Sequence, residues 1–273
     1  MTSHELDLNG DQKMLFVEHR CVVNHWSEAQ PVDLIWYNLE RPNWAPWLAA
    51  SEETIALRGK VFPEGQLVLN TPKGNALAIL SLNQINWDGD IHHLPTWDGV
   101  AGEPTDYSAT YTPNGNTLVL LSMDVSPEFQ GYKIPSKLIK GAQDLAQKLG
   151  VEHVIGSFRP SGFGAIKKGT GYGIDFETYC MMKRANSEKP IDRWLGSLWH
   201  MGMKMLAVDE NAMTVSVSND QFMKYLSEYK PEVWEFIPPN IWECGEVGHW
   251  VDDKDHGIVT YTESNVWGEL PLK

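Results

Sequence analysis

The sequence predicts an α/β fold of the α+β kind, in which helices cover an open and mostly antiparallel sheet. First, apolar runs at 118–125 and 153–158 flank a stretch, 134–149, in which apolar residues recur every three or four positions. Second, runs at 66–70 and 76–85 flank a five-residue turn, the pattern of a β-hairpin. Because no linker divides the chain, we expect one domain over 13–273, preceded by a flexible N-terminus at 1–12.

The composition fits a protein with a sizeable core and an acidic surface. Hydrophobic residues make up 42% of the 273 residues, and 36 acidic against 22 basic residues give a formal net charge of −14. A nucleic acid or an anionic membrane requires a basic surface, so we expect neither as a partner. Cys21, Cys180 and Cys244 lie far apart without metal-ligand spacing, which is typical of reduced thiols. No signal peptide or long apolar run is found, so a soluble cytoplasmic protein is expected.

The N-terminal part predicts a strand at 14–23 and short helices at 31–39 and 46–57, the second with Pro46 at its start. Between the helices, two tryptophans, Trp44 and Trp47, stand among two prolines. Either they wall a binding pocket or they cap the core, as buried tryptophans commonly do.

The hairpin at 66–85 and a third strand at 117–125 predict an antiparallel meander. The stretch 86–116 between them has no periodicity and reads as a long loop. His92 and His93 in this loop suggest a metal only weakly, because adjacent residues of an extended chain point to opposite sides and no third ligand has a familiar spacing. We therefore expect no metal.

The centre of the chain is a strand–turn–helix–strand unit. Its polar turn opens a helix, so it exposes backbone N–H groups and the positive end of the helix dipole, which suits a phosphate or pyrophosphate. An ordinary unit without a ligand explains the pattern equally well.

The C-terminal part predicts a helix at 192–206 with His200 in its middle, a strand at 212–217, a helix at 220–228 and a pair of strands from 233 onward. The two Asn-apolar-Trp segments at 240–242 and 265–267 suggest neighbouring strands. Lys167 and Lys168 form the densest basic spot in the second half, suited to a phosphate or an acidic helix of a partner protein, or to solubility alone.

The turn of the central unit reads Val-Ser-Pro-Glu-Phe-Gln-Gly-Tyr-Lys-Ile-Pro over 125–135. It resembles the signature of the GNAT acyltransferase superfamily: an apolar strand ending in Val, a Pro-Glu-aromatic turn, and Gln/Arg-Gly-x-Gly-x-Gly/Ala at a helix start. The resemblance implies a single GNAT-like domain whose mixed sheet is splayed at its centre, with helices on both faces and extra C-terminal strands.

The same resemblance implies a binding site for acetyl-CoA or malonyl-CoA as acyl donor. The backbone of the first central strand would hold pantetheine and the loop would surround the pyrophosphate, with these residues in contact: Met123, Val125, Gln130, Gly131, Tyr132, Lys133, Ile134 and Ser136. Two residues depart from the pattern. Lys133 replaces the second glycine and adds a cation and a Cβ, and Pro135 replaces Gly or Ala and has no N–H to donate.

Further segments at 86–90, 94–98, 155–161 and 263–267 resemble the GNAT-like proteins of natural-product assembly lines, including loading domains of polyketide synthases. This resemblance implies acyl groups carried on CoA or on an acyl carrier protein. It places Trp44, Trp47 and Arg159 at the substrate pocket, and it offers Ser157 and His200 as catalytic residues.

Three functions follow as hypotheses. The first is acyl transfer from CoA to an amine or to the phosphopantetheine thiol of a carrier protein. The second is decarboxylation of a malonyl thioester to the acetyl thioester, for which a hydroxyl and an imidazole would stabilise the enolate and protonate carbon. The third is acyl-CoA binding without catalysis. The oligomeric state does not follow from the sequence.

Overall fold

The computed structural model describes residues 9–25, 31–102 and 106–272, and the chain divides into two compact units. Unit 1 holds Met1–His93, Gly99–Val154 and Pro271–Lys273, and unit 2 holds Leu94–Asp98 and Ile155–Leu270. Each is an open sheet with helices, so the predicted α/β class is confirmed. The predicted central splay concerns β4 and β5, which lie mainly in different units, and it stays a prediction. None of the helices in the described ranges is long and apolar enough to cross a membrane.

Unit 1 is built on an antiparallel sheet in the order β1 (Val22–His25), β2 (Gln66–Asn70), β3 (Ala76–Ile85) and β4 (Thr117–Val125). The last three have the bounds that the sequence predicts, because long apolar runs between a hairpin turn and a polar turn leave little freedom in register. β2 is buried along its whole length, so both faces of the sheet are covered.

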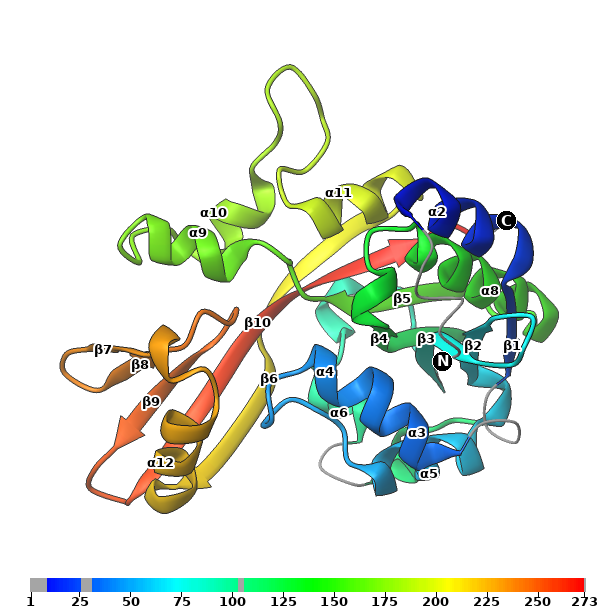
Figure 1. The fold of residues 1–273 in the computed structure, drawn as a ribbon. Coiled ribbons are helices and arrows are strands. Elements are labelled where there is room, and N and C mark those ends of the chain that lie inside the picture. Colours follow the sequence, from blue (N-terminus) through cyan, green and yellow to red (C-terminus); the bar gives the residue numbers. More distant parts are fainter. Residues whose placement is uncertain (1–8, 26–30, 103–105, 273) are drawn as a thin grey trace. The chain divides into compact units, whose positions relative to one another are not determined.

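Helices cover both faces of this sheet (Figure 1). α8 (Ile134–Leu149) packs where Gly141 meets Val23 and Leu67, and its face of buried apolar residues is the one the sequence predicts. On the other face lie α3 (Val32–Ile35), the π-helical η1 (Trp36–Glu40), α4 (Arg41–Asn43) and α5 (Glu52–Val61). Ile35, Leu39 and Ile55 of these helices pack against the side chains of the sheet that point to this face.

The predicted strand at 14–23 is wrong. Residues 10–20 form a helix, α2 (Gly10–Arg20), and β1 follows it. Asn9 and Gln12 cap the helix reciprocally, each side chain accepting from the other's backbone N–H at 3.0 Å. Of the flexible segment expected at 1–12, residues 1–8 lie outside the described residues, and residues 10–12 form the first turn of α2.

The helix predicted at 46–57 begins later than expected, at Glu52, because Ser51 caps it by accepting from Thr54 N at 3.1 Å. The short η2 (Pro63–Gly65) then leads into β2. The stretch 86–116, expected as a loop, contains η3 (Ile91–His93), α6 (Trp97–Ala101) and α7 (Tyr107–Thr110). These helices are too short to leave a periodic signal.

Unit 2 is organised by the long β10 (Ile258–Leu270), which pairs with β6 (Lys204–Ser218) and β9 (His249–Asp253) and has β5 (His153–Phe158) as a neighbour. β8 (Ile241–Glu243) and β7 (Glu235–Ile237) follow β9. The Asn-apolar-Trp segments therefore do not neighbour each other, since β9 lies between β8 and β10. Helices α9 (Phe163–Gly169), α10 (Phe176–Met181), α11 (Arg193–His200) and α12 (Asn219–Glu228) complete the unit, with η5 (Pro231–Val233) before β7.

The helix predicted at 192–206 ends at His200, and β6 begins at Lys204. Gly202 between them has a φ of +87°, in the left-handed region that ends helices. The apolar Met203 and Met205, which seemed to extend the helical pattern, belong to the turn and to the strand. His200 is consequently the exposed last residue of a helix and not a residue in its middle.

Candidate functional site

The loop between β4 and α8 turns back on itself through two residues with positive φ, Gly131 at +87° and Lys133 at +59°. It contains the single turn η4 (Pro127–Phe129), and Lys133 is the N-cap residue of α8. Among the described residues, no protein atom accepts a hydrogen bond from the backbone N–H of Gly131, Tyr132 or Lys133. These donors stand at the positive end of a 16-residue helix, an arrangement that suits an anion.

The two departures from the GNAT pattern have different consequences here. Lys133 is exposed, so its ammonium group is open to an anion, while its left-handed backbone costs about 1–2 kcal/mol that glycine would not incur. Pro135 occupies the first turn of α8, where its missing N–H removes one donor without disturbing the helix. The hydroxyl of Ser136 donates to the carbonyl of Lys133 at 2.7 Å, which closes the turn.

Asn43 of α4 ties the start of this loop to the helices on the opposite side of the sheet. Its Nδ2 donates to the carbonyls of Leu39 at 2.6 Å and Val125 at 3.1 Å, and its Oδ1 accepts from Gln130 Nε2 at 2.9 Å. Gln130 is therefore held by a side chain and is not turned freely toward solvent. The Val125 carbonyl is therefore engaged by the side chains of Asn43 and Gln130.

A buried polar cluster that we did not predict from the sequence lies beside the hydrogen bonds of Asn43. Asp124 of β4 is wholly buried, and its Oδ1 accepts from Trp44 Nε1 at 2.6 Å. Glu40, exposed by only 2%, accepts from Ala50 N at 2.7 Å, and Arg58 is buried nearby. Burial, and then the Glu40 carboxyl, raise the pKa of Asp124 well above its usual value, whereas Trp44 and Arg58 lower it. The signal available in the sequence was one carboxylate inside a mostly apolar run.

The other oxygens of the two carboxyls, Glu40 Oε2 and Asp124 Oδ2, have no donor among the described residues. Because burial and the neighbouring Glu40 carboxyl raise the pKa of Asp124, this carboxyl is the one of the two that favours its protonated form, in which it can donate a hydrogen bond. Trp44 therefore has a defined partner through its N–H. Trp47 is buried, with an exposed fraction of 6%, which agrees with a role in the core.

The two predicted catalytic residues belong to unit 2, and no contact joins them in the described part of the chain. Ser157 lies on β5 with 8% of its surface exposed, and its Oγ has no hydrogen-bond partner among the described residues. His200 is exposed, and its Nε2 lies 2.6 Å from Lys189 Nζ. Because a lysine ammonium can only donate, the imidazole accepts through Nε2, and that nitrogen is not free to act as a base.

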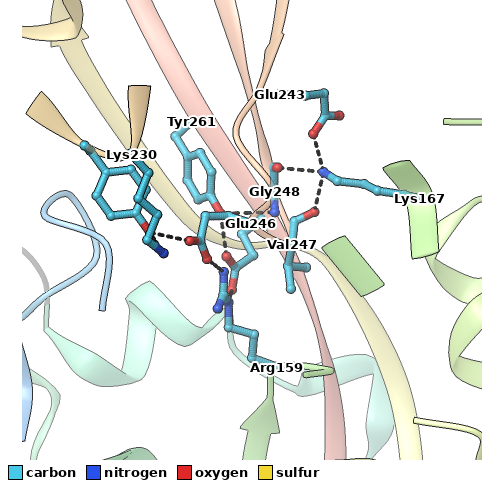
Figure 2. A network of polar contacts seen from close by, with 10 residues as sticks. Arg159, Lys167, Lys230, Glu243, Glu246, Val247, Gly248 and Tyr261 are labelled. Atoms are coloured by element: carbon cyan, nitrogen blue, oxygen red, sulfur yellow. Dashed lines mark hydrogen bonds and ion pairs between the residues drawn. The ribbon is translucent and has the colours of Figure 1, made fainter. Parts of the chain in front are cut away.

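Arg159, expected at the substrate pocket, holds two carboxylates (Figure 2). Its guanidinium donates to Glu246 Oε2 and to Glu263 Oε1, both at 2.7 Å, while Tyr261 donates to Glu263 at 2.6 Å. Tyr229 donates to Glu246 at 2.6 Å and so extends the network. Partial burial raises the pKa of Glu246, but the nearby Arg159 guanidinium and the Tyr229 hydroxyl hold it below its usual value. These contacts make Arg159 a member of a partly buried ionic network.

Lys167 is also engaged in contacts within the protein. Its Nζ lies 2.5 Å from Glu243 Oε2 and donates to the carbonyls of Val247 at 3.0 Å and Gly248 at 2.8 Å (Figure 2). Of the predicted basic spot, Lys168 alone is exposed. Of the two adjacent histidines in η3, His93 has a carboxylate partner, because its Nδ1 lies 2.6 Å from Asp88 Oδ2. No group of three metal-ligating side chains occurs in the described part of the chain.

Comparison with solved structures shows that the chain has the GNAT fold. The loading GNATL domain of CurA from Lyngbya majuscula superposes with a TM-score of 0.58 at 15% identity, covering 92% of this chain and 98% of that one. A GNAT-like decarboxylase, GphF in complex with isobutyryl-CoA, superposes with a TM-score of 0.56 at 19% identity, covering 93% and 100%. The predicted resemblance to GNAT proteins of this kind is thus confirmed at the level of fold. No protein-family model and no curated protein matches the sequence.

Proposed function

We propose that the protein is an acyl-CoA-dependent acyltransferase that binds the donor at the loop between β4 and α8. The observation that carries the proposal is the row of unpartnered amides at Gly131, Tyr132 and Lys133 in front of α8, with the exposed Lys133 ammonium beside them. Backbone donors at a helix N-terminus hold a pyrophosphate without desolvating a buried cation. The GNAT fold and the CoA ligand of the superposed GphF structure support the same assignment.

The acceptor in this proposal is an amine or the phosphopantetheine thiol of a carrier protein. The acceptor attacks the thioester carbonyl, the C–S bond breaks, and the CoA thiolate takes a proton. An enzyme of this kind contributes chiefly by holding the two reactants together and by stabilising the oxyanion, so no covalent intermediate is required.

Decarboxylation of a malonyl thioester is the second candidate function. The whole-chain superposition on a GNAT-like decarboxylase favours it, and so does Ser157, whose buried hydroxyl has an unused donor of the kind that stabilises an enolate. In this reaction the malonyl C–C bond breaks, CO₂ leaves, and carbon takes a proton to give the acetyl thioester.

The two candidates are separated by their products. The protein is incubated with acetyl-CoA and, separately, with malonyl-CoA labelled in its free carboxylate, with and without a holo carrier protein. Acyl transfer predicts free CoA that appears only when an acceptor is present, and no labelled CO₂. Labelled CO₂ with acetyl-CoA as the product, and no need for an acceptor, would replace transfer by decarboxylation. If neither product forms while CoA binds, transfer to a carrier protein and decarboxylation are both rejected.

If CO₂ is released, Ser157→Ala tests the donor directly. Removing one oxyanion donor typically lowers turnover by a factor of about a hundred to a thousand. Because the hydroxyl has no protein partner to lose, the variant should unfold at the same temperature as the wild type. Ser157→Thr keeps the hydroxyl and is the control. His200→Ala should have a smaller effect, since its Nε2 is occupied by Lys189.

A further inference from the structure

Asn43 and Trp44, at the end of α4, hold the last two residues of β4 and the loop that follows them. The indole Nε1 of Trp44 donates to Asp124 Oδ1 at 2.6 Å, and Asn43 Nδ2 donates to the Val125 carbonyl at 3.1 Å. Asn43 Oδ1 accepts from Gln130 Nε2, inside the loop, at 2.9 Å. We call these three hydrogen bonds the α4 clamp. Because two of them reach consecutive residues of β4 and the third reaches the loop, the clamp fixes the direction in which the chain leaves the strand.

The acceptor of the Trp44 N–H is a costly group to place in a buried strand. Asp124 is wholly buried, and its side chain points to the face of the sheet where Glu40 and Trp44 meet it. An apolar side chain at this position of β4 would avoid the cost of burying a carboxyl group. A buried ionisable group that packing does not require is a candidate for a role in function.

The Glu40 carboxyl lies within hydrogen-bonding reach of Asp124. Glu40 is the last residue of η1, and its Oε1 accepts from Ala50 N at 2.7 Å. Neutral Asp124 can donate to Glu40 while it accepts from Trp44, so both contacts form together. Ionised Asp124 would face Glu40 as a second buried negative charge, and Arg58 balances only one of the two. Because moving η1 and α4 away from β4 relieves that repulsion, the clamp is closed when Asp124 carries its proton.

Resting on the proposed function, we propose that Asp124 is a positioning residue, which acts through Trp44 and the α4 clamp to hold the loop between β4 and α8 in the conformation that binds the acyl donor. Asp124 does not itself touch the donor, because its side chain is wholly buried. Its effect reaches the loop through Val125 and Gln130, the other two residues that the clamp holds. Loss of the Asp124 proton opens the clamp, so the affinity for the donor falls.

The groups that face Asp124 come from three elements of unit 1. Of the described residues, Glu40 faces it from η1, Arg58 from α5 and the Trp44 indole from the end of α4, while the paired strand β3 places the apolar Ile79 opposite. Burial and then Glu40 raise the pKa of Asp124, and Trp44 and Arg58 lower it. The proton is therefore present on the folded-state carboxyl below this raised pKa and is lost above it. Since binding and protonation are linked, a donor that prefers the closed clamp raises the same pKa further.

Trp44→Phe tests the clamp with the smallest change, because it removes the N–H that Asp124 accepts and keeps an aromatic ring. The matched control is Trp87→Phe, since the Trp87 indole of the same unit donates to the Asp90 carbonyl at 2.9 Å. Free CoA is the ligand in calorimetry, so a direct contact between the indole and an acyl group cannot contribute. We expect Trp44→Phe to bind CoA at least about tenfold more weakly and Trp87→Phe to bind it as the wild type does.

Two substitutions of Asp124 distinguish positioning from a general loss of structure. Asp124→Asn keeps the acceptor for Trp44 and gains a donor for Glu40, so it should bind CoA as the wild type does at about pH 6, whereas Asp124→Ala keeps neither group and should bind weakly. The carboxyl ¹³C resonance of Asp124 gives the pH at which its proton leaves. The wild-type affinity relative to that of Asp124→Asn should fall through the same pH, and it should stay constant wherever the carboxyl does not titrate.

A Trp44→Phe protein that binds CoA as tightly as Trp87→Phe would contradict the positioning role. So would a wild-type affinity that follows that of Asp124→Asn while the Asp124 carboxyl titrates. The proposed acyl transfer fails separately: CoA that binds with the expected pattern while no acyl group is transferred supports positioning and rejects transfer.

If no variant and no wild type binds CoA, the donor site is rejected and the loop itself gives the answer. The backbone ¹³C resonances of 131–133 are then compared without ligand. Shifts in Trp44→Phe that are missing in Trp87→Phe show that the clamp sets the conformation of the loop. Resonances that are the same in both variants and in the wild type reject it.

Discussion

Lys133 stands where the GNAT pattern has a glycine. Two substitutions of Lys133 distinguish the effect of its charge on CoA binding from the effect of its left-handed backbone on stability. Lys133→Glu places a carboxylate beside the phosphates and should weaken CoA binding by about 1–3 kcal/mol. Lys133→Gly removes the cation and the left-handed strain together, so it should bind CoA less tightly than the wild type and yet be more stable. Lys140→Glu, exposed on the same helix, is the control. Calorimetry showing equal affinities would contradict the phosphate contact.

The buried pair of Asp124 and Glu40 predicts a specific dependence of stability on pH. Since burial and Glu40 raise the pKa of Asp124, the folded state binds its proton at pH values where the unfolded chain has released it. The free energy of unfolding should therefore fall as pH rises above about 4, by up to about 1.4 kcal/mol per pH unit, until the folded-state pKa is passed.

Asp124→Asn removes this dependence. The amide still accepts from Trp44 through its oxygen and can donate to Glu40, so the hydrogen bonds persist without a titrating proton. Urea unfolding between pH 5 and 8 should show a smaller slope for the variant and, at pH 8, a stability at least equal to the wild type. Identical slopes for the two proteins would mean that Asp124 is ionised in the folded state.

At the scale of elements, α9 is attached to the turn between β8 and β9 by one buried lysine. Lys167→Met leaves the Glu243 carboxylate buried without its cation and two carbonyls without a donor. Burial already raises the pKa of Glu243 and Lys167 lowers it, so removing Lys167 should cost about 3–5 kcal/mol at neutral pH.

Lys168→Met is the matched control for this substitution, because it removes the same charge from the neighbouring exposed position and should change stability by less than about 0.5 kcal/mol. Adding Glu243→Gln to Lys167→Met should recover part of the loss. A Lys167→Met protein as stable as the control would show that the ion pair does not hold α9.

Elements were predictable where a long periodic pattern was bounded by turn residues, as in β2, β3, β4, β5 and α8. They were not predictable where local chemistry decided the outcome. The capping of α2 by Asn9 outweighed the apolar residues that suggested a strand, and Gly202 divided an apolar run between α11 and β6. The loop between β4 and α8 could be located by its residues, but the contacts of Arg159 and His200 depend on Glu246, Glu263 and Lys189. Sequence spacing does not reveal those partners.

At the scale of the whole molecule, a net charge of −14 should make stability depend on salt. Acidic groups repel one another in the folded chain, and at about 0.1 M ionic strength the screening length falls to about 10 Å. The buried pairs of Lys167 and Arg159 are screened much less, so added salt should remove more repulsion than attraction. We expect the unfolding temperature to rise as NaCl is increased from about 20 to about 300 mM, a range over which the screening length shortens strongly. For a chain of this size, about 1 kcal/mol of added stability corresponds to a rise of about 2–4 °C.

The variant with Lys224→Glu and Lys254→Glu provides the control, since it lowers the net charge by four without touching a buried pair. Its unfolding temperature should lie below that of the wild type at low salt, and the difference should shrink as salt is added, because the extra repulsion is between exposed groups. Calorimetric scans of both proteins across the salt series measure this. An unfolding temperature that falls with salt in the wild type would mean that surface ion pairs outweigh the repulsion. A difference between the two proteins that does not depend on salt would point to lost local contacts of the two lysines and not to net charge.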